Sequence, residues 1–294
     1  MGYRIGFDIG STTIKAVVLD ENNQICYKSY ERHKAQVRQK ALDKLVELKK
    51  YTKEPFKFAI SGSGALGLSE QGELPFVQEV FASATGVSKL YPETDCAIEL
   101  GGEDAKILFF QGSVEQRMNS TCAGGTGAFI DQMATLLNMS LEEMNEASLN
   151  YHRLYPIASR CGVFAKTDIQ PLINQGVDKC DLCASIFQAV VDQTITSLAQ
   201  GRKIEGNILF LGGPLYFMSG LRNRFVETLK LSDVQVNCPD TAINFVALGT
   251  AICADQDYTY DEFYKVLEDL VHAPAKLTES KPLFESEEDY QKFI

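Results

Sequence analysis

The sequence has no dense block of lysine and arginine. Its 294 residues include 28 Lys and Arg against 39 Asp and Glu, a formal net charge of −11 at pH 7. An acidic surface repels phosphate backbones, so the composition argues against a nucleic-acid partner. Residues 34–53 are locally basic, but Leu42, Leu45 and Leu48 recur among the charges, which predicts the solvated face of an amphipathic helix.

Long apolar segments are also missing. No stretch approaches the roughly 20 apolar residues that span a membrane. No cationic region followed by an apolar run stands near the N-terminus, so the sequence shows no secretory signal. We therefore expect a cytoplasmic protein with no membrane partner.

Histidine and cysteine are sparse. The three histidines, His33, His152 and His272, are scattered and predict no histidine metal centre. Eight cysteines are a modest number, and in a reducing compartment they favour free thiols over disulfides. Four of them lie in apolar runs and are expected to be small core residues. These four are Cys26, Cys96, Cys238 and Cys253.

The pair Cys180-Asp-Leu-Cys183 has two functional readings, a redox pair or half of a zinc site. The chain has no second pair with this spacing. The segment leads into a helix-like pattern with Ile186, Val190 and Ile195. We therefore expect a structural or incidental role for this pair.

The predicted elements form the same pattern twice. Each half begins with closely spaced strands that read as an antiparallel meander, and helices follow. In the first half the strands cover 3–8, 15–20, 25–30 and 56–61, and the helices cover 35–51 and 76–90. In the second half the strands cover 95–100, 105–110, a run after 113, 208–211 and 234–237, and the helices cover 126–137, 140–150, 162–175, 182–200, 218–230 and 242–254. This duplication predicts an α/β protein of two lobes with a cleft between them.

The predicted boundaries follow from this pattern. Residues 1–94 would form lobe I, completed by a C-terminal helix over 242–270. Residues 95–241 would form lobe II. The composition changes from about Asp257, and 271–294 would be an acidic tail or a truncated linker, either loosely attached or the start of a further domain.

The turn in Asp8-Ile-Gly-Ser-Thr-Thr-Ile-Lys15 lies between two predicted strands. Gly10 lets the backbone approach a ligand closely. The hydroxyl and N–H groups of Ser11, Thr12 and Thr13 can surround phosphate oxygens. Lys15 adds a compact positive charge, and Asp8 can hold Mg²⁺ through water. Alone, the segment is equally consistent with an ordinary β-turn.

Two later segments favour the nucleotide reading. Glu99-Leu-Gly-Gly-Glu-Asp-Ala-Lys106 repeats the strand–turn–strand setting with Gly101, Gly102, Glu103 and Asp104 in the turn. Leu211-Gly-Gly-Pro-Leu215 follows a strand. The flat face of an adenosine could lie against the small residues of this segment, which are Gly212, Gly213 and Pro214. The three segments occur in the order expected for a two-lobed ATPase.

Two cysteines differ from the others in their setting. Cys122 precedes a run containing Gly125 and Gly127, and Cys161 precedes Gly162, each ahead of a predicted helix. A helix N-terminus favours the thiolate form of such a cysteine. Two thiolates are too few for an iron–sulfur cluster, which typically takes four, but a two-fold dimer would supply four. The pattern therefore predicts a metal site at a subunit interface.

Together these segments resemble the phosphate-1, phosphate-2 and adenosine motifs of the superfamily of sugar kinases, Hsp70 and actin. With the cysteine motifs, residues 3–254 resemble the ATPase activators of 2-hydroxyacyl-CoA dehydratases and the related benzoyl-CoA reductase ATPase subunits. The resemblance implies a duplicated actin-like/Hsp70-like (ribonuclease H-like) ATPase fold that binds ATP or ADP.

The resemblance also implies a homodimer with one [4Fe–4S] cluster bridging the subunits, held by Cys122 and Cys161 of each. Mg²⁺ would lie near Asp8 and Asp104, and Glu79 is a candidate base for orienting the attacking water. ATP hydrolysis would drive one low-potential electron from a ferredoxin or flavodoxin donor to an acceptor dehydratase or reductase metalloprotein, as in anaerobic metabolism.

Some features depart from the family pattern or refine it. Glu99 stands where the phosphate-2 loop usually has Asp, and Glu103 stands where Gln is common, which leaves open the acid that orients the metal. The N-terminal activase module of the large multidomain members is resembled by three segments: Tyr30-Glu-Arg-His33, Arg117-Met-Asn-Ser-Thr-Cys122 and Leu211-Gly-Gly-Pro-Leu215. Alternatives are a sugar-type kinase of the same fold without a cluster, or a docking module that binds nucleotide without turnover.

Overall fold

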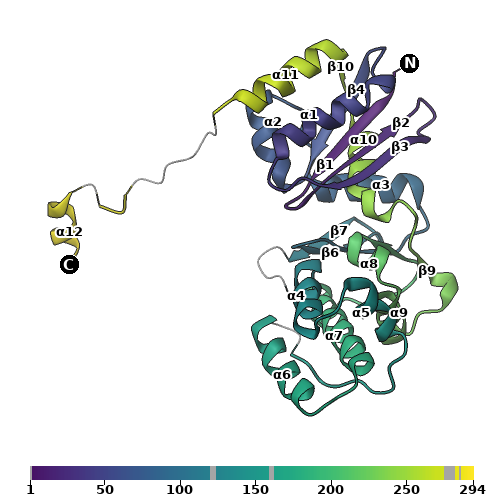
Figure 1. Cartoon of the computed structure of the whole chain (residues 1–294). Coiled ribbons are helices and arrows are strands. Elements are labelled where there is room, and N and C mark those ends of the chain that lie inside the picture. The colour runs from purple at the N-terminus through teal and green to yellow at the C-terminus, as the bar shows by residue number, and fades with distance from the viewer. Residues whose placement is uncertain (1, 120–123, 159–161, 275–281, 285) are drawn as a thin grey trace.

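The computed structural model describes residues 2–119, 124–158, 162–274, 282–284 and 286–294. Cys122 and Cys161 lie outside the described residues. Within the described part, strands form two five-stranded mixed sheets, each in its own lobe, and helices cover them (Figure 1).

The first sheet has the strand order β10-β4-β1-β2-β3. β1 pairs antiparallel with β2 and parallel with β4, so the hairpin turn between β1 and β2 lies beside the end of β4. The strands are β1 Arg4–Ile9, β2 Thr13–Leu19, β3 Ile25–Arg32, β4 Phe56–Ser61 and β10 Gln256–Tyr258. The helices of this lobe are α1 Val37–Glu47, α2 Leu66–Gly72, α3 Glu79–Leu90, α10 Phe245–Cys253 and α11 Tyr260–His272.

The second sheet has the order β7-β6-β5-β8-β9 and repeats the pattern of the first, with an antiparallel β5–β6 hairpin beside the parallel strand β8. The strands are β5 Cys96–Leu100, β6 Ala105–Phe109, β7 Glu115–Asn119, β8 Ile208–Leu211 and β9 Val236–Asn237. The helices of this lobe are α4 Gly127–Leu137, α5 Leu141–Ser148, α6 Gly162–Asn174, α7 Lys179–Thr194, α8 Gly213–Phe217 and α9 Ser219–Leu229. The two hairpin turns therefore occupy equivalent places in the two lobes.

Helices α3 and α10 pack where the lobes meet. Their backbones approach so closely that a Cβ on Gly249 would lie 2.0 Å from the carbonyl oxygen of Ala82. α10 is almost wholly buried, as expected of a helix that is apolar on all sides. A shared apolar cluster includes Val17 from the first sheet, Leu209 from the second and Phe245 from α10. This common core fixes the hairpin turns of the two sheets relative to each other.

The segment after α10 differs from the single helix expected over 242–270. α10 ends at Cys253, β10 adds a strand to the first sheet, and α11 follows. α11 begins with a capping box between Thr259 and Glu262, and it buries Phe263 and Leu267. It packs against α1, so the core of the first lobe is closed by residues far apart in the sequence.

Two sequence expectations need correction. Cys26 is exposed rather than a core residue, because β3 alternates and lies at the edge of its sheet; Cys96 is buried as expected, and Cys238 and Cys253 are half-buried. One helix, Lys179–Ala199, is long and apolar enough to cross a membrane by length and composition, contrary to the expectation that no such stretch exists. However, 72% of that window is buried inside the protein, where it forms part of the core of the second lobe.

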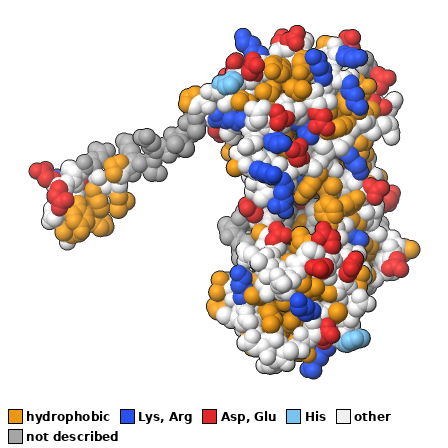
Figure 2. Space-filling model, in the orientation of Figure 1, with side chains coloured by type: hydrophobic (Ala, Val, Ile, Leu, Met, Phe, Trp, Pro, Cys, Tyr) orange, Lys and Arg blue, Asp and Glu red, His pale blue; other side chains and the backbone are white. Residues whose placement is uncertain are grey.

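The last helix, α12 Glu287–Phe293, lies away from both lobes (Figure 1). Phe284 contacts Tyr290 and Phe293 within this extension. Leu283, Phe293 and Ile294 remain largely exposed, and Figure 2 shows the hydrophobic side chains gathered on the extension.

Candidate functional site: the turns between the two lobes

The first predicted phosphate turn joins β1 to β2. The N–H of Gly10 donates to the carbonyl of Thr13 at 2.9 Å, which closes the turn. Ser11 and Thr12 are exposed, whereas Thr13 begins β2 and is buried. The turn therefore presents two hydroxyl side chains to solvent from a rigid hairpin.

Asp8 lies at the base of this turn and is nearly inaccessible, with 2% of its surface exposed. Its Oδ2 is 2.7 Å from Nζ of Lys15 across the hairpin. Burial lowers the pKa of Lys15, but the Asp8 carboxylate outweighs it and holds that pKa above its ordinary value. Lys15 is thus charged at neutral pH, and Asp8 retains its other oxygen for a ligand.

The second predicted turn joins β5 to β6. The N–H of Gly101 donates to the carbonyl of Asp104 at 2.8 Å, and Glu103 is exposed. The carbonyls of Gly101 and Gly102 accept the first N–H groups of α4, from Gly127 at 3.0 Å and Ala128 at 2.8 Å. The turn is consequently bonded directly to the helix that follows the Cys122 segment.

The third predicted segment ends β8 and begins α8. Gly212 has φ +87°, and a Cβ there would lie 2.0 Å from the carbonyl oxygen of Leu100. Only glycine fits this position without strain. Gly213 and Pro214 form the first turn of α8, and Pro214 lies beside α4, because a Cβ on Gly127 would be 3.3 Å from its Cγ.

The three segments face one another. A Cβ on Gly102 would lie 3.7 Å from Oγ1 of Thr12, so the two hairpin turns approach across the junction of the lobes. A Cβ on Gly213 would lie 3.9 Å from the hydroxyl of Tyr30 at the edge of the first sheet. Gly125 stands apart from this group: it has φ +82° and packs against Gln193 of α7.

A buried lysine joins the acidic residues of the second turn. Lys106 Nζ lies 2.6 Å from Glu79, 2.8 Å from Asp104 and 3.3 Å from Glu99. Ser83 donates a further hydrogen bond to Glu99 at 3.0 Å. Burial lowers the pKa of Lys106, but these carboxylates outweigh it and hold that pKa well above its ordinary value.

Glu79 begins α3 and projects into this cluster. Burial raises the pKa of Glu79, the Lys106 ammonium opposes the rise, and the nearby carboxylates of Asp8 and Glu99 add to it. Glu79 is therefore a mostly buried carboxyl group that lies near acidic residues of both hairpins, Asp8 of the first and Glu99 of the second.

The sequence reasoning missed Lys106 as the centre of this cluster. The signal available was a charged residue in an otherwise buried strand, since all five residues of β6 are buried. A buried charge requires partners, but the sequence could not show that Glu79, Glu99 and Asp104 supply them. Among the described residues, no group of three or more His, Cys, Asp and Glu is arranged to hold a metal.

Of the two cysteine segments, the structure describes the residues that come next, from Gly124 and from Gly162 onward. A Cβ on Gly162, the residue after Cys161, would lie 3.4 Å from Cδ2 of Phe129 in the first turn of α4. The helices that begin after the two segments therefore start side by side. Val163 and Phe164, in the first turn of α6, are 68% and 64% exposed.

The Cys180–Cys183 pair begins α7. Both thiols are free, and burial raises the pKa of each, that of Cys183 to about 12. Thiols with raised pKa values are poor nucleophiles and poor metal ligands at neutral pH. The burial of Cys183 and the raised pKa values favour the structural or incidental role expected for this pair.

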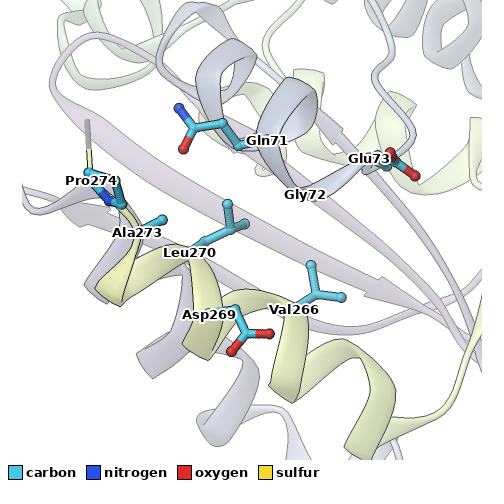
Figure 3. A pocket seen from close by; sticks show the side chains of 8 residues that line it. All are labelled: Gln71, Gly72, Glu73, Val266, Asp269, Leu270, Ala273 and Pro274. Carbon is cyan, nitrogen blue, oxygen red and sulfur yellow. The ribbon is translucent and has the colours of Figure 1, made fainter. Parts of the chain in front are cut away.

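A separate pocket opens between α2 and α11 (Figure 3). Its lining consists of Gln71, Gly72, Glu73, Val266, Asp269, Leu270, Ala273 and Pro274. It contains none of the predicted nucleotide or metal residues, and its acidic side chains disfavour a phosphate ligand.

Known proteins resemble most of the chain. The (R)-2-hydroxyglutaryl-CoA dehydratase activating ATPase of Acidaminococcus fermentans is 28% identical over 257 residues, 86% of this chain and 96% of that protein. The activator of lactoyl-CoA dehydratase from Anaerotignum propionicum is 29% identical over 258 residues, 86% of this chain and 97% of that protein.

A solved structure also matches. The activator of the 2-hydroxyisocaproyl-CoA dehydratase from Clostridium difficile with bound ADPNP superposes with a TM-score of 0.75 at 25% identity, covering 94% of this chain and 100% of that one. This likeness confirms the predicted actin-like ATPase fold. A family model matches residues 5–254, and the chain therefore belongs to the BadF/BadG/BcrA/BcrD ATPase family.

Proposed function

We propose that this ATPase is an activator that uses ATP hydrolysis to drive one-electron transfer from a subunit-bridging [4Fe–4S] cluster to a partner metalloenzyme such as a 2-hydroxyacyl-CoA dehydratase. The names of the matched activators support this partner class. The electron donor would be a ferredoxin or a flavodoxin.

One observation carries the proposal: the residues that follow Cys122 and Cys161 lead into helices that start together, with Gly162 packed on Phe129. Two such helix N-termini favour an anionic group between them. Because one chain offers two cysteines in this setting, a four-thiolate site needs a second subunit. The exposed Val163 and Phe164 are apolar surface suited to such a homodimer contact.

The four cysteine thiolates of such a dimer match the ligands of a [4Fe–4S] cluster in type and in number. Cys122 and Cys161 of each subunit would hold it. When bound, a [4Fe–4S] cluster would store and release single electrons at low potential.

The nucleotide would lie between the facing turns. N–H and hydroxyl groups of residues 11–13 and the glycines at 101 and 102 would bind the phosphates, with Gly10 allowing close approach of the backbone, and residues 212–214 would contact the adenosine. Asp8 and Asp104 would hold Mg²⁺ through water, in keeping with the preference of Mg²⁺ for a few carboxylates, phosphate oxygens and retained waters. Glu79 would orient the attacking water.

Contacts of the second turn support a route by which the two proposed sites would communicate. The hydrogen bonds from Gly127 and Ala128 to the carbonyls of Gly101 and Gly102 connect the second turn to α4. A shift of this turn when the γ-phosphate leaves would be transmitted to α4 and to the segment before it. Such a γ-phosphate-dependent hinge is a recurring two-state device.

Anaerobic iron and sulfide analysis combined with sedimentation tests the proposal. We expect about four iron atoms per dimer, with Cys122→Ala and Cys161→Ala losing the iron while still binding ADP. Cys180→Ala, which changes a cysteine outside the proposed site, should retain it. Full iron content in Cys122→Ala would overturn the ligand assignment, and a colourless protein that phosphorylates a sugar would favour the kinase alternative.

A further inference from the structure

His33 lies directly behind the first phosphate turn. It follows β3 and is 4% exposed. Its backbone N–H donates to the carbonyl of Thr12 at 3.2 Å, and its ring Nε2 lies 3.0 Å from the carbonyl oxygen of Gly10. One residue therefore contacts two carbonyl groups of a turn only four residues long.

A third contact determines which ring nitrogen carries the proton. The N–H of Ala35 donates to Nδ1 of His33 at 3.2 Å. A backbone N–H can only donate, so Nδ1 must accept and the neutral ring must carry its proton on Nε2. The Nε2–H group then donates to the carbonyl of Gly10.

The backbone after His33 is bent to make this contact. Lys34 and Ala35 have φ values of 49° and 62°, in the left-handed region that residues other than glycine seldom occupy. The carbonyl of His33 accepts the N–H of Gln36 at 2.8 Å, which closes the bend. Two consecutive residues in this region are a local irregularity of the kind that persists at functional sites.

The bond to Gly10 has a geometric consequence for the turn. In a trans peptide the carbonyl and the following N–H point in opposite directions. Holding the carbonyl of Gly10 against His33 therefore directs the N–H of Ser11 away from His33. Ser11 is exposed, so that N–H lies on the open side of the turn.

An anion-binding turn needs its N–H groups toward the ligand and its carbonyls turned away. We propose that His33 is a positioning residue for nucleotide binding: it fixes the carbonyl of Gly10 away from the polyphosphate and thereby points the N–H of Ser11 at it. This inference rests on the proposed placement of the nucleotide at residues 10–13. No direct contact between His33 and the nucleotide is required.

Three substitutions separate the two ring contacts. His33→Ala removes both. His33→Gln places an amide nitrogen where Nε2 stands and can still donate to Gly10. His33→Asn reaches only the position of Nδ1 and can accept from Ala35 but cannot reach Gly10. His152→Ala is the control, because the side chain of His152 is exposed and, among the described residues, its hydrogen bond is made by its backbone N–H.

Titration calorimetry with Mg·ADP and steady-state ATPase kinetics would measure the effect. We expect His33→Ala and His33→Asn to weaken ADP binding and raise KM for ATP about tenfold, with a smaller effect on kcat, and His33→Gln to restore most of the affinity. ¹⁵N spectra of the histidine ring should show the Nε2–H tautomer in the wild type.

The outcomes are distinguishable. If the wild type binds ADP and His33→Asn binds it as tightly as His33→Gln, the positioning role is wrong while the proposed function stands. An Nδ1–H tautomer in the wild type would also contradict the positioning role. This measurement uses the wild type alone, so it does not require any variant to fold. If the wild type binds no nucleotide, both the inference and the proposed function fail.

Discussion

Oε2 of Glu79 lies 2.6 Å from Nζ of Lys106, so the first residue of α3 is ion-paired with a strand of the other lobe. This ion pair holds a carboxyl group of lobe I beside Asp104 in the second turn. The ion pair therefore links the two lobes directly beside the proposed nucleotide site.

If Glu79 orients the attacking water, Glu79→Gln should lower kcat for ATP hydrolysis about 100-fold, because an amide cannot accept a proton. The amide can still accept the hydrogen bond from Lys106, so ADP affinity should change little. Single-turnover hydrolysis and ADP titration measure the two quantities separately. Glu70→Gln, at an exposed position on α2, is the control, and equal rates for both variants would remove Glu79 from the mechanism.

The pH dependence provides an independent check on the same residue. Burial raises the pKa of Glu79, and only its ionised form can act as a base. The rate should therefore fall as the pH is lowered through this raised pKa, which lies above about 4.3, the usual value for glutamate. In Glu79→Gln this acid limb of the kcat profile should be absent. An unchanged profile in the variant would assign the limb to another group.

The sequence predicted β4 and β8 with the bounds that the structure shows, because each is a short apolar run ended by glycine or serine. It missed α2 and the separate helix α11. The capping box of α11 is visible in the sequence, but its acidic face obscured the apolar spacing of Phe263 and Leu267. The core that these two side chains enter is formed by distant parts of the chain: Phe263 packs against Phe56 and Phe58 of β4, and α11 lies against α1.

The candidate site was predictable to a similar extent. Turn residues such as Gly10 and Gly101 can be read from local sequence, because a hairpin turn is specified by its own residues. The Lys106 cluster was not predictable, since its carboxylates come from α3, β5 and the second turn. Their convergence depends on packing between lobes, which no local pattern encodes.

Gly212→Ala should strongly destabilise the protein. Its Cβ would lie 2.0 Å from the carbonyl of Leu100, and φ is +87°. Strain and overlap together should reduce the free energy of unfolding by about 3 kcal/mol or more. Gly112→Ala is a matched control, because Gly112 has φ +89° but nothing within 4 Å of its Cβ position. It should cost only about 1–2 kcal/mol, and urea unfolding giving equal losses would show that contact with Leu100 is unimportant.

Asp181 should stabilise the protein in a pH-dependent way. Its Oδ1 accepts the N–H groups of His152 at 2.7 Å and Arg153 at 2.9 Å, and these bonds lower its pKa. A lowered pKa stabilises the fold above the unfolded-state value of about 3.9, and this contribution is lost as the pH falls through the folded-state pKa. The urea midpoint of Asp181→Asn should therefore lie below that of the wild type at pH 7 and approach it near pH 3. If the difference between the two urea midpoints were the same at pH 7 and near pH 3, the charge of Asp181 would play no part in stability.

Asp168 fastens the chain just before Cys161. Its Oδ2 accepts the N–H of Ala158 at 2.7 Å from an exposed position on α6. Asp168→Ala removes this hydrogen bond, so the free energy that holds the segment before Cys161 against α6 should fall by about 1 kcal/mol. If Cys161 is a cluster ligand, iron should pass to a chelator about fivefold faster, while Asp168→Asn, which keeps an acceptor oxygen, should behave nearly as the wild type. Lys166→Ala, at an exposed position on the same helix, controls for altered surface charge, and identical release rates for Asp168→Ala and Lys166→Ala would separate Asp168 from the metal site.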